Sequence, residues 1–304
     1  MGLRHIPVMV EEVISLLGCA PHHIYVDATL GGGGHTAEIL KRTGPDGIVI
    51  GVEWDEDALS IAKETLKPFG ERVKVFRENF THLPELLKAM NIDAVEGILL
   101  DLGLSSIQLE KEERGFRLRG EGPLDMRMDQ RQTMTAKDFI NCLSAEELEN
   151  VLAEYGEERW SRRIARAVVE ERSRGPIETT QELRKIVYRV IPKRFQTKRI
   201  DPATRTFQAL RIQVNDELHH LKTILERGWP LLKKGGRMCV LSFHSLEDRI
   251  VKEAFRNLGK GTGEGMAGRG VMRVLTKKPL IPSLEEKERN PRSRSAKLRC
   301  AERV

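Results

Sequence analysis

Tyr25–His35 reads YVDATLGGGGH and is followed by TAEIL at Thr36–Leu40. Aromatic and β-branched residues before Asp27 predict a short buried strand, the four glycines predict a sharp turn, and the residues after the turn predict a helix. The first amides of such a helix lack intrahelical partners, so they can bind a polar or anionic ligand at the carboxyl end of the strand. An ordinary tight turn is the alternative reading of the glycines alone.

A second apolar strand, predicted at Ile48–Val52, leads into Glu53, which lies 22 residues after Gly31. In doubly wound folds an acidic residue about 20 positions beyond the glycine turn accepts hydrogen bonds from ribose hydroxyls. A dinucleotide fingerprint needs a third glycine where this chain has Thr36. The pattern therefore favours a mononucleoside such as S-adenosylmethionine over a nicotinamide cofactor. A solvated strand end is the alternative for Glu53.

The composition is that of a folded protein without a membrane span. The chain has 304 residues, of which 39% are apolar, so it has room for one large or two modest domains with a buried core. No apolar run approaches the roughly 20 residues that cross a bilayer, and Glu11 and Glu12 interrupt the one N-terminal segment that resembles a signal sequence. We expect a cytoplasmic protein.

Neither the cysteines nor the histidines predict a metal site. The four cysteines are far apart and form no Cys-x-x-Cys pair: Cys19, Cys142, Cys239 and Cys300. This spacing favours ordinary thiols over a disulfide framework or a zinc site. The pairs His22–His23 and His219–His220 lack further ligands at useful spacing, so we expect no bound metal.

The net charge of +6 is concentrated in two regions. Between Glu157 and Arg211 there are 15 Lys or Arg against 7 Asp or Glu, and between Lys287 and Val304 there are 7 against 2. A regional excess of this kind is typical of a polyanion-binding face beside a nearly neutral fold. A solvated helix face is the alternative for the arginines of Glu157–Arg172.

Strands and helices alternate along the first third of the chain. Further apolar strands are predicted at Val73–Phe76 and Gly97–Leu100, the second of which leads into Asp101. Four βα units in succession predict an α/β fold with a doubly wound, mostly parallel Rossmann-like sheet. Near the end of the chain, Val271–Thr276 and Lys297–Ala301 are expected to pair as antiparallel edge strands.

The alternation stops after Gln108 and resumes with a helical run from Phe207 through Leu225 and a strand at Met238–Leu241. Because the intervening stretch has no apolar strand, it predicts an inserted, smaller all-helical domain. We expect an α/β domain of residues 1–108 and 207–304 and a helical domain of residues 109–206. Asp27, Asp101 and the SFHS sequence at Ser242–Ser245 should then converge on one edge of the sheet.

Motifs of one family run through nearly the whole chain. They are HIPV (His5–Val8), GGGGH (Gly31–His35), DLGLSS (Asp101–Ser106), RGF (Arg114–Phe116), GPLDMRMD (Gly122–Asp129), YGEE (Tyr155–Glu158), PATRTFQA (Pro202–Ala209), SFHSLEDR (Ser242–Arg249) and NPRSRS (Asn290–Ser295). With these motifs the chain resembles the class I S-adenosylmethionine-dependent methyltransferases, and much more closely the bacterial 16S rRNA cytosine-N4 methyltransferase family (RsmH, also called MraW).

The resemblance implies which residues bind S-adenosylmethionine. They are Gly33, Gly34 and His35 at its amino-acid end, Glu53 at its ribose, Phe80 with Asn79 at its adenine, and Asp101 and Gln108 to complete the pocket. Many relatives have Asp where this chain has Glu53. The extra methylene shifts the carboxylate but keeps its bidentate chemistry.

The resemblance also implies the substrate, which is a cytidine in the decoding region of 16S rRNA in the small ribosomal subunit, bound with help from the helical insert. Asp101 is the candidate catalytic residue, as acceptor for a hydrogen of the cytosine N4. The alternative is that Asp101 only binds the cofactor, because Leu102–Leu104 lacks the proline and aromatic residues that DNA amino-methyltransferases have at this strand end.

Two other classes of function stay open from the sequence. A noncatalytic, nucleoside-sensing RNA-binding protein would not need Asp101. A methyltransferase acting on a small molecule would not need a basic insert, and the absence of two prolines after Asp101 argues against one acting on DNA. The sequence also leaves open the roles of Ser242, His244 and Asp125. It does not decide between free rRNA and an assembled particle as substrate, or between a monomer and a homodimer.

Overall fold

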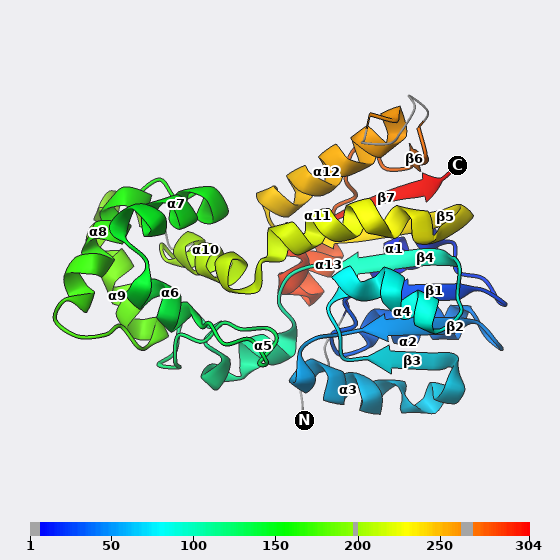
Figure 1. Cartoon of the computed structure of the whole chain (residues 1–304), viewed down its shortest axis with the longest axis horizontal. Coiled ribbons are helices and arrows are strands. Elements are labelled where there is room, and N and C mark those ends of the chain that lie inside the picture. Colours follow the sequence, from blue (N-terminus) through cyan, green and yellow to red (C-terminus); the bar gives the residue numbers. More distant parts are fainter. Residues whose placement is uncertain (1–6, 197–199, 263–269) are drawn as a thin grey trace. The chain divides into compact units, whose positions relative to one another are not determined.

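The computed structural model describes residues 7–196, 200–262 and 270–304, and its elements are labelled in Figure 1. Of the predicted motifs, His5 and Ile6 lie outside the described residues. The chain divides into two compact units, one formed by Met1–Ser105 with Leu218–Val304 and the other by Ser106–Glu217.

The first unit contains a seven-stranded sheet in the order β3-β2-β1-β4-β5-β7-β6. Its strands are β1 (Ile24–Asp27), β2 (Ile48–Val52), β3 (Val73–Phe76), β4 (Val95–Asp101), β5 (Leu232–Ser242), β6 (Met272–Val274) and β7 (Lys297–Arg303). The first five run parallel to one another. The predicted mostly parallel, Rossmann-like sheet is confirmed.

Helices of the first unit cover both faces of this sheet. They are α1 (Val10–Leu17), α2 (Gly34–Arg42), α3 (Glu56–Leu66), α4 (Leu83–Ala89), α11 (Glu217–Gly228), α12 (Ser245–Lys260) and α13 (Leu284–Arg289). Short 3₁₀ helices join them at η1 (Lys67–Arg72), η2 (Phe80–His82), η5 (Trp229–Leu231) and η6 (Pro291–Ser295).

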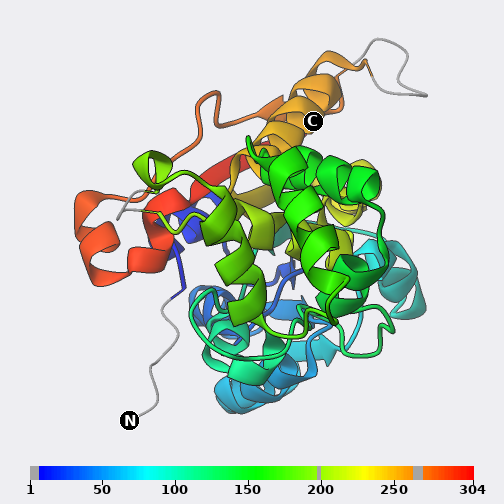
Figure 2. The same cartoon turned by 90° about the vertical axis from the view of Figure 1, so that its left-hand side faces the viewer.

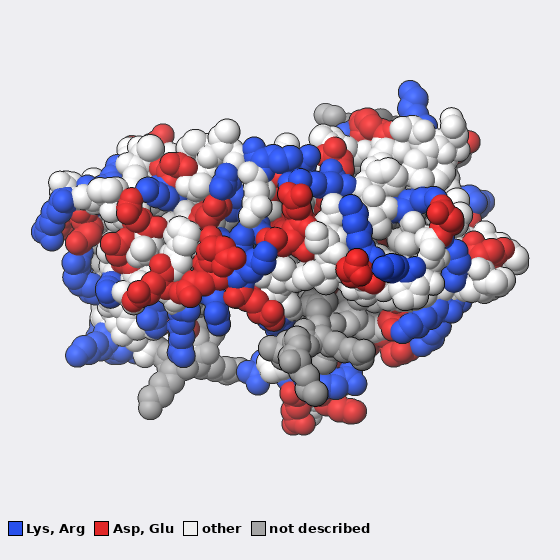
Figure 3. Space-filling view, turned by 90° about the horizontal axis from the view of Figure 1, so that it is seen from below, with Lys and Arg blue, Asp and Glu red and all other residues white. Residues whose placement is uncertain are grey.

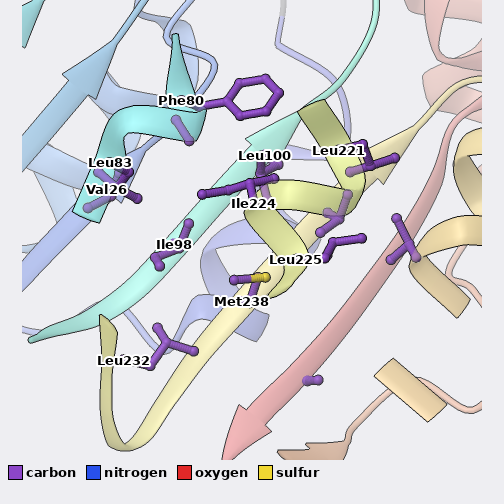
Figure 4. Close-up of a cluster of buried hydrophobic side chains, with 14 of the residues drawn as sticks. Val26, Phe80, Leu83, Ile98, Leu100, Leu221, Ile224, Leu225, Leu232 and Met238 are labelled. Atoms are coloured by element: carbon purple, nitrogen blue, oxygen red, sulfur yellow. The ribbon is translucent and has the colours of Figure 1, made fainter. Parts of the chain in front are cut away.

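Successive strand residues face two separate cores, because side chains of a strand alternate between its faces. Tyr25 and Leu99 pack in the core that contains the apolar residues of α1, α2 and α3. Their neighbours Val26 and Ile98 pack in the core that contains those of α4, α11 and α12, which Figure 4 shows in close-up. Each fully buried aliphatic side chain of this kind contributes about 1.5–3 kcal/mol. The sheet is therefore doubly wound, as predicted.

The last strands run against the others. β7 is antiparallel to β5, with Cys300 opposite Cys239, and β6 is antiparallel to β7. The predicted pairing near the end of the chain is confirmed, but β7 is not an edge strand. It lies between β5 and β6, which explains why its five central residues are all buried.

The described part of the second unit consists of helices, with an isolated bridge between Pro123 and Thr179. The helices are α5 (Ser106–Glu110), η3 (Glu112–Arg114), α6 (Ala136–Cys142), α7 (Ala145–Gly156), α8 (Ser161–Arg172), α9 (Thr180–Val190), η4 (Lys193–Phe195) and α10 (Thr204–Asn215). Of these, α6 to α10 pack together in the bundle coloured green in Figure 2. α7 packs against α8 and α10, and a Cβ on Gly156 would lie 2.7 Å from Arg205 O, so the glycine permits this close approach.

The units divide at Ser105 and Leu218, whereas the sequence predicted boundaries after Gln108 and before Phe207. The helical run predicted through Leu225 is two helices, α10 and α11. Asp216 separates them with a left-handed φ of 48°. Because α10 packs against α7, residues 207–217 belong to the second unit, and apolar periodicity gave no sign of this break.

Candidate active site

The glycine turn opens the carboxyl end of β1. Gly31 and Gly33 have φ values of 52° and 81°, in the left-handed region that favours glycine. α2 begins at Gly34, and its N-cap Gly33 offers no side chain to the first amides. A Cβ on Gly33 would lie 3.0 Å from Leu66 Cγ, so the turn is packed closely on one side. Among the described residues no side-chain cap binds the first backbone N–H groups of α2, which therefore suit a polar ligand.

Glu53 follows β2 at the same edge of the sheet and is 8% exposed. Its Oε2 accepts a hydrogen bond from Gly31 N–H at 2.8 Å, and its Oε1 accepts one from Asp55 N–H at 2.9 Å. Burial raises the pKa of Glu53 to about 7, although these two backbone groups oppose the shift. Each oxygen keeps a second lone pair, which a pair of ribose hydroxyls can use.

Asp101 ends β4 and lies beside His35, the second residue of α2. Asp101 Oδ2 is 3.3 Å from His35 Nδ1, and His35 Nε2 is 2.9 Å from Val8 O. With an acceptor at each ring nitrogen, His35 suits the doubly protonated form. Burial disfavours that charge, but the hydrogen bond and the negative charge of Asp101 raise the pKa of His35. Among the described residues Asp101 Oδ1 is buried and has no hydrogen-bond partner.

Asp27 ends β1 and is 1% exposed. Its Oδ2 accepts a hydrogen bond from the Thr36 hydroxyl at 2.7 Å. Burial raises the pKa of Asp27, and the neighbouring charge of His35 opposes this shift. Asp27, Glu53 and Asp101 therefore form one acidic rim at the carboxyl ends of three adjacent strands, as the sequence predicted for Asp27 and Asp101.

Phe80 lies with two aromatic residues that the sequence analysis missed. The ring centroids of Trp54 and Phe80 are 6.3 Å apart, and those of Trp54 and His220 are 5.6 Å apart. Asn79 Nδ2 lies 3.3 Å from His220 Nδ1. Trp54 directly follows Glu53, and this adjacency was a usable signal, whereas His220 comes from distant α11. An aromatic group beside a buried carboxylate with free lone pairs suits a purine nucleoside.

Gln108 lies in α5 of the second unit, where it is buried. Its contact with the cofactor stays a prediction. Asp125 pairs with Arg127 at 2.7 Å and Asp129 pairs with Arg131 at 2.8 Å, so both acids have basic partners within their own unit.

Ser242 and His244 have partners at the carboxyl end of β5. The Ser242 hydroxyl donates to Lys297 O at 3.4 Å. His244 is the N-cap of α12, where its Nδ1 accepts from Glu247 N–H at 3.5 Å and the Glu247 carboxylate accepts from His244 N–H at 3.2 Å. These contacts favour structural roles for both residues.

Within residues 7–196, 200–262 and 270–304, no cluster of His, Cys, Asp or Glu has the geometry to hold a metal ion. No helix in these ranges combines the length and apolarity that a bilayer crossing requires. Cys19, Cys142, Cys239 and Cys300 are free thiols.

The chain is similar to known proteins along its whole length. Residues 2–304 match the model of the MraW methylase family. The chain is 48% identical over 308 residues to the ribosomal RNA small subunit methyltransferase H of Geotalea uraniireducens and 47% identical over 309 residues to that of Halothermothrix orenii. Each match covers 99% of this chain and 99% of the relative.

Solved structures resemble the chain more weakly. A putative rRNA methylase from Clostridium thermocellum is 13% identical with a TM-score of 0.43, over 96% of this chain and 94% of that one. An rRNA methylase from Streptococcus thermophilus is 12% identical with a TM-score of 0.44, over 100% and 99%. The full-length matches, and not these structures, confirm the predicted family, methyltransferase activity and methyl donor S-adenosylmethionine. The chain belongs to the MraW methylase family.

Proposed function

We propose that the protein transfers a methyl group from S-adenosylmethionine to the exocyclic N4 of a cytidine in the decoding region of 16S rRNA, in the cytoplasm. The relatives at 47–48% identity are named as small-subunit rRNA methyltransferases. The observation that carries the chemistry is Asp101 Oδ1, a buried acceptor at the end of β4 without a hydrogen-bond partner among the described residues. Leaving such a group unpaired costs about 1–3 kcal/mol, which favours a ligand that donates a hydrogen bond there.

We propose that S-adenosylmethionine binds at the acidic rim, through the residues that the motifs indicate. S-adenosylmethionine, when bound, supplies an electrophilic methyl group. Glu53 suits its ribose, because backbone N–H groups fix both carboxylate oxygens and each keeps a lone pair. The remaining assignments are Phe80, with Asn79 and Trp54, at the adenine; Gly33, Gly34 and His35 at the amino-acid end; and Asp101 and Gln108 to complete the pocket.

Asp101 is the proposed catalytic residue. The lone pair of the cytosine N4 is delocalised into the ring, so this amine is a poor nucleophile. As the new N–C bond forms, the bond from the methyl group to the sulfur of the donor would break, and the demethylated donor would leave as a neutral thioether. N4 becomes pyramidal and positive in this step, so Asp101 Oδ1 would accept a hydrogen bond from N4–H and then take that one proton. His35 acts as a positioning residue, because it holds Oδ2 and leaves Oδ1 free for the substrate.

The second unit is the proposed rRNA-recognition domain, predicted at residues 109–206. Its arginine face consists of four exposed residues: Arg159, which comes just before α8, and Arg162, Arg163 and Arg166 within this helix. None of them has an acidic partner in the described part of the chain. On the face of the molecule shown in Figure 3, by comparison, Lys and Arg are mixed with Asp and Glu. Unpaired guanidinium groups on one helix suit the phosphates of an RNA backbone.

Aromatic rings adjoin the arginine face. The ring centroids of Trp160 and Phe195 are 5.5 Å apart, and Phe195 is 48% exposed. Arg163 lies over Trp160 at 5.0 Å and Arg194 lies over Phe195 at 4.9 Å. Exposed rings beside cations stack well on unpaired bases, which supports single-stranded RNA as the ligand of this unit.

The test is incubation with labelled S-adenosylmethionine and one of three substrates: assembled small ribosomal subunits, protein-free 16S rRNA or DNA. We expect N4-methylcytidine in the rRNA of the assembled subunit, in the protein-free rRNA, or in both. We expect none in DNA. Label at another base or position, or in DNA alone, would contradict the proposal. The same assay with the Asp101→Asn variant is the matched control. It measures the label that reaches the substrate without catalysis by this enzyme.

A further inference from the structure

A second basic site lies on the first unit, along α12. This helix begins at the carboxyl end of β5 and runs away from it, and its 16 residues span about 24 Å. Between its second half and β6 lies a cavity of about 680 Å³. We name it the α12 pocket. Its lining includes six cationic side chains: Lys252, Arg256, Lys260, Arg273, Lys277 and Arg299.

The cations on α12 form a single row. Lys252, Arg256 and Lys260 are four residues apart, so they share one face of the helix and repeat about every 6 Å along it. All three are exposed, and none has an acidic partner in the part of the chain that the structure describes. Like charges at this spacing destabilise a helix. The helix dipole compensates only Lys260 in the last turn, so the row as a whole fits an anionic ligand.

A buried guanidinium also lines the pocket. The side chain of Arg299 is only 7% exposed, and its Nε donates to Asp248 Oδ1 at 2.7 Å. In the described ranges the side chain of Arg299 makes this one hydrogen bond. The N–H groups of its two terminal nitrogens can therefore donate to a ligand. Arg273 also has an acidic partner, Glu302, at 2.5 Å, so Arg299 and Arg273 contribute hydrogen-bond donors to the pocket and not unpaired charge.

The floor of the pocket is apolar and fixed by close backbone packing. Phe255 and Met272 are 1% and 2% exposed and line the cavity. A Cβ on Gly270 would lie 2.2 Å from Gly259 O, and Val271 N–H donates to Leu258 O at 2.9 Å. The strand therefore lies directly against the end of α12, and the pocket is a built feature of the fold.

We propose that the α12 pocket binds the sugar-phosphate backbone of the RNA substrate, as a second contact outside the acidic rim. This inference rests on the proposed function for the identity of the RNA. Three unpaired cations in a row match a run of phosphates, Arg299 adds a buried phosphate donor, and the apolar floor takes a sugar or a base edge. A small inorganic anion could not contact all three cations of the row on α12, and it would not fill the apolar floor of the pocket.

The test compares two triple variants with equal change of charge. Lys252→Gln/Arg256→Gln/Lys260→Gln removes the row on α12. Lys63→Gln/Lys88→Gln/Lys222→Gln removes three exposed lysines on α3, α4 and α11 that have no acidic partner among the described residues. Binding of protein-free 16S rRNA and of assembled small subunits is measured over a salt series. Calorimetry with S-adenosylmethionine checks that each protein is folded.

We expect the α12 variant to bind rRNA at least tenfold more weakly than the control variant at low salt. The slope of log K against log salt should fall by about 2, because each phosphate contact contributes about 0.7 on single strands. Equal affinity and slope in the two variants would overturn the inference. So would a defect seen with assembled subunits but not with protein-free rRNA, because the occupant would then be a ribosomal protein.

These outcomes are distinct from failure of the proposed function. If the wild-type enzyme methylates rRNA while the α12 variant binds it like the control, only the α12 pocket is refuted. If the wild-type enzyme leaves rRNA unmethylated, the proposed function fails, and the salt series still decides whether the pocket holds RNA.

Discussion

The acidic rim and the arginine face of α8 carry opposite charges in opposite settings. At the rim, Glu53 and Asp101 are largely buried, and Glu53 is held by backbone hydrogen bonds shorter than 3 Å. On α8, Arg162 and Arg166 are exposed and have no acidic partner within the described residues. A rigid, dry site suits one small ligand with a fixed geometry, whereas exposed cations attract a polyanion over a distance and in a salt-dependent way. Changes at the two regions should therefore have separable effects.

The largest effect is expected for Asp101→Asn. The amide has a weaker acceptor and cannot take a proton, so single-turnover methyl transfer at saturating cofactor should fall about 10²–10⁴-fold. Affinity for S-adenosylmethionine, measured by calorimetry, should change much less. Asp93→Asn makes the same chemical change at an exposed site of the same unit and should behave as wild type. Unchanged chemistry in Asp101→Asn would leave this residue a role in cofactor binding alone.

Glu53→Gln comes next. Losing the charge weakens the proposed hydrogen bonds from the ribose, and hydrogen bonds to charged groups contribute about 1.5–3 kcal/mol. S-adenosylmethionine should bind about 10–100-fold more weakly in calorimetry. Glu64→Gln, at an exposed position of α3, is the control. If the Glu53→Gln variant binds S-adenosylmethionine as tightly as the wild type, Glu53 does not bind the ribose.

The pH dependence of cofactor binding should be smaller. Burial raises the pKa of Glu53 to about 7, above its ordinary value near 4.3. The proposed ribose hydrogen bonds need the ionised carboxylate, so affinity should rise with pH and be about tenfold weaker at pH 6 than at its plateau above pH 8. In the free protein the sign reverses, because a raised pKa contributes stability at low pH that is lost as the pH rises through 7. A calorimetric pH series on wild type and Glu53→Gln checks this, and an equal slope in both would contradict the assignment.

The smallest effect is expected on α8. Arg162→Gln/Arg166→Gln should weaken rRNA binding about fivefold, because exposed ion pairs contribute about 0.2–1 kcal/mol each. Affinity for S-adenosylmethionine should not change. Filter binding at two salt concentrations measures the affinity for rRNA. The charge-matched control is Lys63→Gln/Lys88→Gln. A loss of cofactor affinity in the α8 variant would break the separation between the two regions.

The parallel part of the fold could be read from the sequence because its signals are local. Each strand is a short apolar run that ends in a turn, and Glu53 and Asp101 follow such runs directly. The contact between His35 and Asp101 could not be read in this way, since it depends on the distance between two strand ends. The same is true of His220, which reaches the aromatic group from α11.

The domain boundary was missed for a related reason. Phe207–Leu225 has continuous helical periodicity, and this masked the break at Asp216, whose left-handed conformation the adjacent turn-forming residues Asn215 and Asp216 could have indicated. The position of β7 inside the sheet, between β5 and β6, was also missed. This buried strand contains two charged residues, Arg299 and Glu302. Both are satisfied by ion pairs with Asp248 and Arg237.

The strands β4 and β5 are neighbours in the sheet, yet the chain between Asp101 and Leu232 contains the whole second unit. Joining them directly from an unfolded chain means closing a very long loop, at an entropic cost that grows with the logarithm of its length. If the α-helical bundle forms first from its local contacts, it replaces most of that loop by a compact body. Refolding kinetics should then show helix formation ahead of completion of the sheet.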